Sequence, residues 1–168
     1  MKNEGLKTFI TIAKLSVATI LTLIITIAFS SCDKKDVAAS TAVLRTKTIV
    51  LNATSGNTQS GSAVIAENAD HSFNINITLQ NTVKDTVMVM HIHNGSIASP
   101  GSIAIPLTSI KGTGSSASGT TLNIKTAASA NGTATAVTYD NIITYLGYFN
   151  VHYSTVQIAK VVANANIK

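Results

Sequence analysis

The sequence predicts an all-β domain, arranged as an antiparallel sandwich or Greek-key barrel with one short helical turn. Three observations predict it. Charged residues make up only 11% of the 168-residue chain and Trp is absent, a composition that favours strands and turns over helices. From residue 43 onward, apolar and polar residues alternate with a period of two. Turn-rich segments, such as residues 54–61 and 112–119, separate the alternating runs.

The clearest strand is predicted over residues 71–80, HSFNINITLQ. One face of this strand carries His71, Phe73, Ile75, Ile77 and Leu79, and the polar residues between them lie on the other face. The same alternation predicts seven further strands, over residues 43–52, 62–67, 86–93, 102–107, 120–125, 147–153 and 156–167.

One segment has helical periodicity instead. In TYDNIITYL, residues 138–146, apolar residues recur at helical spacing behind Asp140, which is the predicted N-cap. Gly147 is placed to end the helix. We therefore expect one short helix that leads directly into the strand at 147–153.

The first 31 residues have the layout of a secretory signal peptide. Lys2, Lys7 and Lys14 precede an apolar run of about 15 residues that ends at Phe29, and small residues follow. An uncleaved N-terminal anchor is the alternative. The run is shorter than the roughly 20 residues that span a bilayer, so the signal peptide is favoured.

Cys32, the only cysteine in the chain, follows directly on this leader. The letters FSSC that end at Cys32 resemble a bacterial lipobox, which implies that Cys32 becomes the acylated, palmitate-bearing first residue of the mature protein. Two or more acyl chains make a stable membrane anchor. We expect a signal peptide over residues 1–31, a lipidated cysteine and tether over 32–42, and a β domain over 43–168. The expected location is the cell envelope, on the periplasmic side of the outer membrane or at the cell surface.

The charge pattern argues against nucleic-acid binding. Three of the twelve basic residues and one of the seven acidic residues lie in the leader, which leaves nine and six and a net charge of +3 on the mature chain. The longest basic run is Lys34-Lys35, beside the anchor, and no dense basic stripe follows it. No nucleic-acid partner is therefore expected, and the protein is expected to contact the membrane through the lipid on Cys32.

Three of the four histidines lie in two motifs, MHIHNG and YFNVH. On a strand, His91 and His93 share one face about 7 Å apart, while the methionines and the isoleucine around them face the other way. Two such imidazoles can bind one copper or zinc ion at about 2.0–2.1 Å if a neighbouring strand supplies a third ligand. His152 is the natural third ligand, with His71 as a further candidate.

The order of the motifs resembles that of the CHRD (chordin-type) domain family. That order is HIHNG, the apolar strand IAIPL, the glycine-rich segment 112–119, a short helical turn and YFNVH, and the resemblance covers about residues 43–167. It implies an immunoglobulin-like or superoxide-dismutase-like β-barrel without established catalytic activity. The family's usual Gly-Glu-Ile-Arg-Gly pattern is replaced here by VQIAK at residues 156–160.

Copper-zinc superoxide dismutases also bind copper through a strand-borne His-x-His and a later histidine. Between the two motifs of this chain, residues 94–151 contain no histidine and a single carboxylate, Asp140, so a bridging ligand and a zinc loop are missing. Dismutase activity is therefore not expected. No Gly-x-Ser-x-Gly elbow or phosphate-binding loop is present either, and no catalytic residue is predicted.

Two functions of different classes remain open. The first is a non-enzymatic binding or structural module held at a membrane, with an envelope protein, a matrix component or a glycan as its partner. The second is a mononuclear copper or zinc protein that uses His91, His93 and His152. The three imidazoles also admit a purely structural role, as groups that hydrogen-bond loop carbonyls and the side chains of Asn94 and Asn150.

Overall fold

The computed structural model describes residues 45–168, and the predicted leader, lipidated cysteine and tether lie outside the described residues. Eight strands form one antiparallel sheet: β1 (Thr46–Ala53), β2 (Ser60–Glu67), β3 (Phe73–Gln80), β4 (Val87–Ser96), β5 (Ser99–Lys111), β6 (Ala117–Ile124), β9 (Gly147–His152) and β10 (Val161–Asn166). A separate hairpin contains β7 (Thr126–Ala128) and β8 (Ala134–Ala136), and one helix, α2 (Tyr139–Ile143), follows it.

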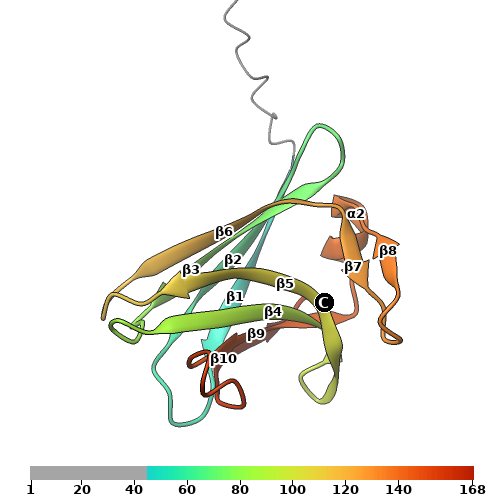
Figure 1. The fold of residues 1–168 in the computed structure, drawn as a ribbon. Helices are drawn as coiled ribbons and strands as arrows, with labels where there is room; N and C mark the ends of the chain where they lie inside the picture. The colour runs from blue at the N-terminus through green and yellow to red at the C-terminus, as the bar shows by residue number, and fades with distance from the viewer. Residues whose placement is uncertain (1–44) are drawn as a thin grey trace, which may run out of the picture. The chain divides into compact units, whose positions relative to one another are not determined.

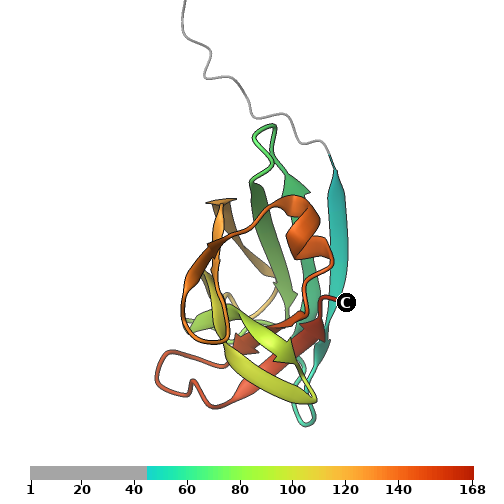
Figure 2. The same cartoon turned by 90° about the vertical axis from the view of Figure 1, so that its right-hand side faces the viewer.

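The eight strands are ordered β5-β4-β9-β10-β1-β2-β3-β6, and the sheet curls until its two edge strands face each other (Figures 1 and 2). At this seam side chains take the place of a backbone ladder. Thr121 of β6 accepts a hydrogen bond from the backbone N–H of Thr108 in β5 at 2.8 Å and donates to the Thr108 hydroxyl at 3.2 Å. The predicted fold class, an antiparallel all-β barrel with one short helix, is confirmed.

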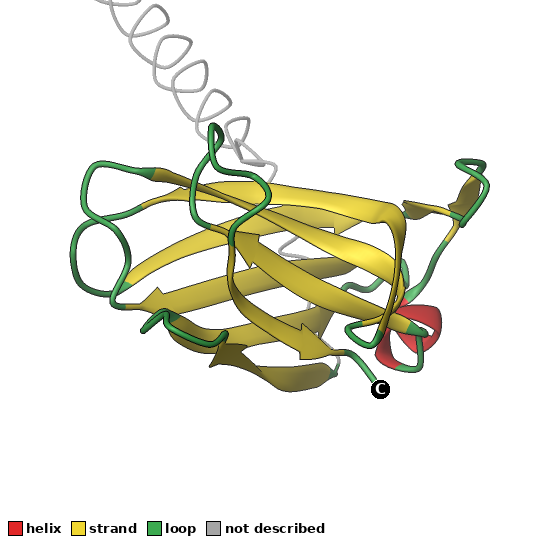
Figure 3. Ribbon diagram, turned by 90° about the horizontal axis from the view of Figure 1, so that it is seen from below, coloured by secondary structure: helices red, strands yellow, loops and turns green. Residues whose placement is uncertain are grey.

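Alternate residues of the strands fill the interior of the barrel, and Figure 3 shows the strands that surround it. In β4, Met88, Met90 and Ile92 are fully buried, while the residues between them lie on the outer face. Phe149 and Val151 of β9 are also fully buried. They pair with the buried positions of β4, so both strands turn the same alternate residues inward. The prediction that the two methionines face away from the histidines is thus confirmed.

The helix is shorter than predicted and begins at a different residue. Its N-cap is Thr138, whose hydroxyl accepts from the backbone N–H of Asn141, and not the predicted Asp140, which lies inside the first turn. The Asn141 side chain accepts in return from the Thr138 N–H at 3.1 Å, which completes a capping box. The C-cap is Thr144, and Gly147 is the first residue of β9. Within residues 45–168, no helix has the length and hydropathy needed to cross a membrane.

Several predicted strands start at other residues than in the structure, and the error is largest at β10. Residues 156–160 belong to a loop, and β10 begins only at Val161, because the chain has to reverse between β9 and β10. Within the loop, the backbone N–H of Gln157 donates a 3.1 Å hydrogen bond to the Ser154 hydroxyl and so stabilises the turn. His71 lies outside β3, with a φ of 61° that leaves the extended conformation. The short hairpin β7–β8 was not predicted, since its Ala-Thr sequence has no apolar alternation.

Candidate metal centre

The sheet brings three histidines together from two neighbouring strands. β4 carries His91 and His93 on the face opposite its core residues, as predicted. The antiparallel register pairs His91 with Asn150 of β9. His152 lies two residues beyond Asn150 on the same face, which places it diagonally across from His91. One nitrogen from each of the three rings lies within 4.8 Å of the other two.

The three rings face one another closely enough to share an ion. The ring centroids of His91 and His152 are 5.3 Å apart, those of His91 and His93 are 5.8 Å apart, and those of His93 and His152 are 6.3 Å apart. Around a tetrahedral ion with bonds of 2.0–2.1 Å, the ligand nitrogens would be separated by about 3.3 Å. Side-chain rotations that draw the nitrogens together by up to about 1.5 Å would therefore complete the geometry.

Four ring nitrogens in this cluster are buried and have no hydrogen-bond partner. They are Nδ1 of His91, Nε2 of His93 and both ring nitrogens of His152. Within residues 45–168, no other buried side-chain nitrogen or oxygen lacks a partner. A buried polar atom left unsatisfied costs about 1–3 kcal/mol. The unsatisfied hydrogen-bonding capacity of the described part of the chain is thus concentrated at one place.

His93 is the one histidine of the cluster with a hydrogen bond. Its Nδ1 lies 3.1 Å from the carbonyl oxygen of Gly101. A carbonyl can only accept, so Nδ1 carries the proton, and in the neutral ring Nε2 keeps a free lone pair. Nε2 is the buried atom without a partner. The ring of His93 also stacks on that of Tyr148 at 5.1 Å, which limits its rotation.

A β-bulge explains how Gly101 reaches His93. His93 pairs with Ile103, and the next pair in the ladder between β4 and β5 is Gly95 with Pro100. The register shifts between these two pairs. β5 therefore has one more residue than β4 in this interval, and such an insertion bends the strand. The bend directs the carbonyl of Gly101 toward the histidine.

Burial and charge both favour neutral imidazoles here. Burial lowers the pKa of His91 below its ordinary value, and the neighbouring His152 and His93 lower it further. Burial also lowers the pKa of His152, and His93 adds to that shift. The backbone carbonyl of Ile158 opposes the shift of His152, although it makes no hydrogen bond of normal geometry to either ring nitrogen. Neutral imidazole is the form that binds metals.

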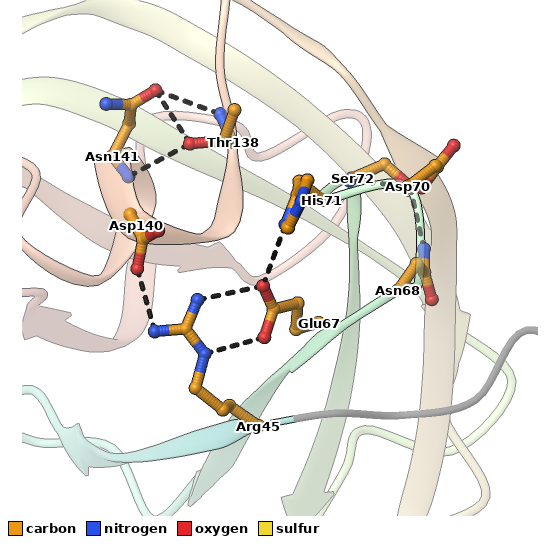
Figure 4. A network of polar contacts seen from close by, with 9 residues as sticks. All are labelled: Arg45, Glu67, Asn68, Asp70, His71, Ser72, Thr138, Asp140 and Asn141. Carbon is orange, nitrogen blue, oxygen red and sulfur yellow. Dashed lines mark hydrogen bonds and ion pairs between the residues drawn. The ribbon is translucent and has the colours of Figure 1, made fainter.

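His71, the further candidate ligand, is not part of the cluster. Its Nδ1 lies 3.3 Å from Oε1 of Glu67 (Figure 4). Arg45 binds both oxygens of Glu67, at 2.6 and 2.8 Å, and contacts Asp140 in α2 at 2.9 Å. The side chain of Glu67 is buried, and the hydrogen bonds from Arg45 lower its pKa to about 2 against the opposing effect of burial. These contacts form an ion-pair network that links β2 to α2 and does not include the histidine cluster.

Sequence reasoning missed two residues that contact His93, Gly101 and Tyr148, and it assigned the wrong partner to Asn94. Instead of bonding a histidine, Asn94 donates to the carbonyls of Ser102 and Ala128 and accepts from the hydroxyl of Tyr145. These contacts tie β4 to β5, β7 and the segment after α2. Of the hydrogen bonds expected for purely structural histidines, the structure contains the one between His93 and a backbone carbonyl. The position of Asn94 directly after the two histidines, in the motif HIHNG, was the sequence signal for these supporting contacts.

Comparison with known proteins identifies the family. The model of the CHRD domain matches residues 40–157, which is most of the chain. The match ends within the segment VQIAK, where the sequence departs from the family's usual pattern. No curated protein and no solved structure matches the chain. The chain belongs to the CHRD domain family.

Proposed function

We propose that this CHRD domain is a non-enzymatic binding module, lipid-anchored outside the cytoplasm through Cys32, and that His91, His93 and His152 bind one copper or zinc ion in it. The observation that carries the metal site is the set of four buried ring nitrogens without a partner, drawn from three rings that face one another. An ion bound between the rings would satisfy one nitrogen of each.

The donor set determines the class of metal. All three ligands are imidazoles, and imidazole suits zinc, copper and nickel, whereas calcium and magnesium prefer oxygen ligands. The lowered pKa values of His91 and His152 reduce the competition from protons at neutral pH. The Gly101 carbonyl supplies the outer hydrogen bond that orients a metal-binding histidine, as is common in metal sites.

Metal titration of the full-length protein in detergent tests the site. The wild-type protein is expected to bind one zinc or copper ion by calorimetry. His91→Gln and His152→Gln are each expected to weaken binding roughly 100-fold or more, since loss of an outer-shell partner alone costs 10- to 100-fold. His71→Gln is the matched control, because it removes a histidine that pairs with Glu67 and should leave the metal affinity unchanged. Equal binding by the wild-type and His91→Gln proteins would remove the site.

The anchor rests on the sequence around Cys32 and has its own test. The lipobox-like FSSC and the apolar leader support acylation of Cys32. Cells fed a clickable palmitate analogue are expected to label the wild-type protein in the membrane fraction and to leave Cys32→Ser unlabelled. Labelling of Cys32→Ser, or recovery of unlabelled wild-type protein in the soluble fraction, would contradict the anchor without affecting the metal site.

A further inference from the structure

The cluster contributes no negative charge to the ion it would hold. Its three ligands are imidazoles, which bind a metal ion in their uncharged form. Residues 45–168 contain four acidic side chains, and three of them, Glu67, Asp70 and Asp140, are paired with Arg45 or Lys125. The fourth, Asp85, lies in the turn before β4, where its N–H donates to the carbonyl of Gly112. None of the four belongs to the histidine cluster.

A divalent ion between these rings would therefore keep its full charge at a partly dehydrated position. His152 is only 7% exposed, and the four free ring nitrogens are shielded from solvent. Burying a charge without a counter-charge is costly, so such a site favours any anion that can reach the ion.

The ligand count leaves room for that anion. Zinc and copper sites with three histidines commonly have a fourth position that water or an exogenous ligand takes. His91 and His93 are both partly exposed, which places the cluster at the outer surface of the sheet rather than inside the barrel. The exposed parts of these two rings give a small solute a route to an ion held there.

We propose that the divalent ion bound by His91, His93 and His152 takes a small monodentate anion from solution as its fourth ligand. This inference rests on the proposed metal site. It assigns the centre a second ligand class: the domain binds a metal ion and an anion together, with the anion bonded to the metal and compensating its charge.

Azide binding to the copper-loaded, full-length protein tests the inference. The protein is loaded with Cu(II), freed of excess copper by gel filtration and titrated with azide. We expect a new azide-to-copper charge-transfer band that saturates at one azide per copper, with a changed copper hyperfine splitting in the electron paramagnetic resonance spectrum. The double variant His91→Gln/His93→Gln should lose the retained copper and the band together, and His71→Gln should keep both.

The possible results separate the two proposals. If one copper is retained per wild-type chain and azide changes neither spectrum, the anion position is ruled out while the metal site stands. If the band persists in the double variant, azide binds copper elsewhere on the protein and the inference fails. If the wild-type chain retains no copper, the metal site fails and the inference fails with it.

Discussion

The Nδ1 of His93 lies 3.1 Å from the carbonyl oxygen of Gly101, and this contact determines which nitrogen of His93 is free for a metal. The proton on Nδ1 faces the carbonyl, which leaves Nε2, buried and without a hydrogen-bond partner, as the nitrogen with a free lone pair. The position of a backbone carbonyl in β5 thereby controls a side chain of β4.

Gly101→Ala is expected to weaken metal binding about 10- to 100-fold, the usual cost of losing an outer-shell hydrogen bond. A Cβ at this position would come within 2.6 Å of the Asn94 carbonyl oxygen, so the backbone of β5 has to shift and carry its carbonyl away from His93. Calorimetric titration measures the affinity, and circular dichroism checks that the fold is kept. Ser102→Ala, one residue along, should bind metal as the wild type does. Unchanged affinity in Gly101→Ala would show that the carbonyl does not orient His93.

The metal-free protein should lose stability as the pH falls below about 6.5, the ordinary histidine pKa. The pKa values of His91 and His152 are lower in the folded state, so the unfolded chain binds more protons in this interval and is favoured. The contribution is complete above pH 6.5 and is lost toward the folded-state pKa values. Urea unfolding in chelator from pH 8 to pH 5 measures this. The double variant His91→Gln/His152→Gln should have a flatter profile, and an equal slope in both proteins would contradict the assignment.

A second loss of stability is expected at lower pH from Glu67. Its pKa is lowered from 4.5 to about 2, chiefly by hydrogen bonds from Arg45. The contribution of this carboxylate is therefore present above pH 4.5 and is lost as the pH falls toward 2. Glu67→Gln should be less stable at pH 7 and should lack this acid-dependent loss. An acid-dependent loss of wild-type size in Glu67→Gln would contradict this assignment.

Tyr145 and Asn94 should be energetically coupled. The Tyr145 hydroxyl donates to the side-chain oxygen of Asn94, and the Asn94 amide donates to Ala128 and Ser102. Tyr145→Phe removes one hydrogen bond and should cost about 0.5–1.5 kcal/mol of unfolding free energy. Asn94→Ala leaves several groups unpaired and should cost about 1–3 kcal/mol. In a double-mutant cycle the combined loss is expected to be smaller than the sum of the single losses. Additive losses would indicate that the bond contributes nothing to stability.

Much of the fold is local in origin and was predictable. Alternation alone placed β3 and β4 and put the methionines of β4 in the core, because one face of each strand is buried. The same rule failed at residues 156–160, where Val156 and Ile158 alternate but are exposed. Their role depends on how the chain turns between β9 and β10, which is a matter of topology and not of local pattern.

The candidate centre divides in the same way. The shared face of His91 and His93 follows from their spacing, whereas the approach of His152 depends on the pairing of β4 with β9 across more than fifty residues. Gly101 could not be predicted at all, since its carbonyl faces His93 only because of the bulge in β5. Sequence spacing identifies ligands that share one strand. The positions of His152 and Gly101 depend on the register between strands.

The metal content of the protein as isolated tests the central claim most directly. The full-length protein is purified in detergent without chelators, and copper and zinc are measured by mass spectrometry together with protein concentration and superoxide dismutation. Close to one copper or zinc ion per chain is predicted for the wild type and for His71→Gln, with little metal in His91→Gln/His152→Gln and no dismutation in any of them. A wild-type protein with no more metal than the double variant would contradict the claim that these histidines form a metal site.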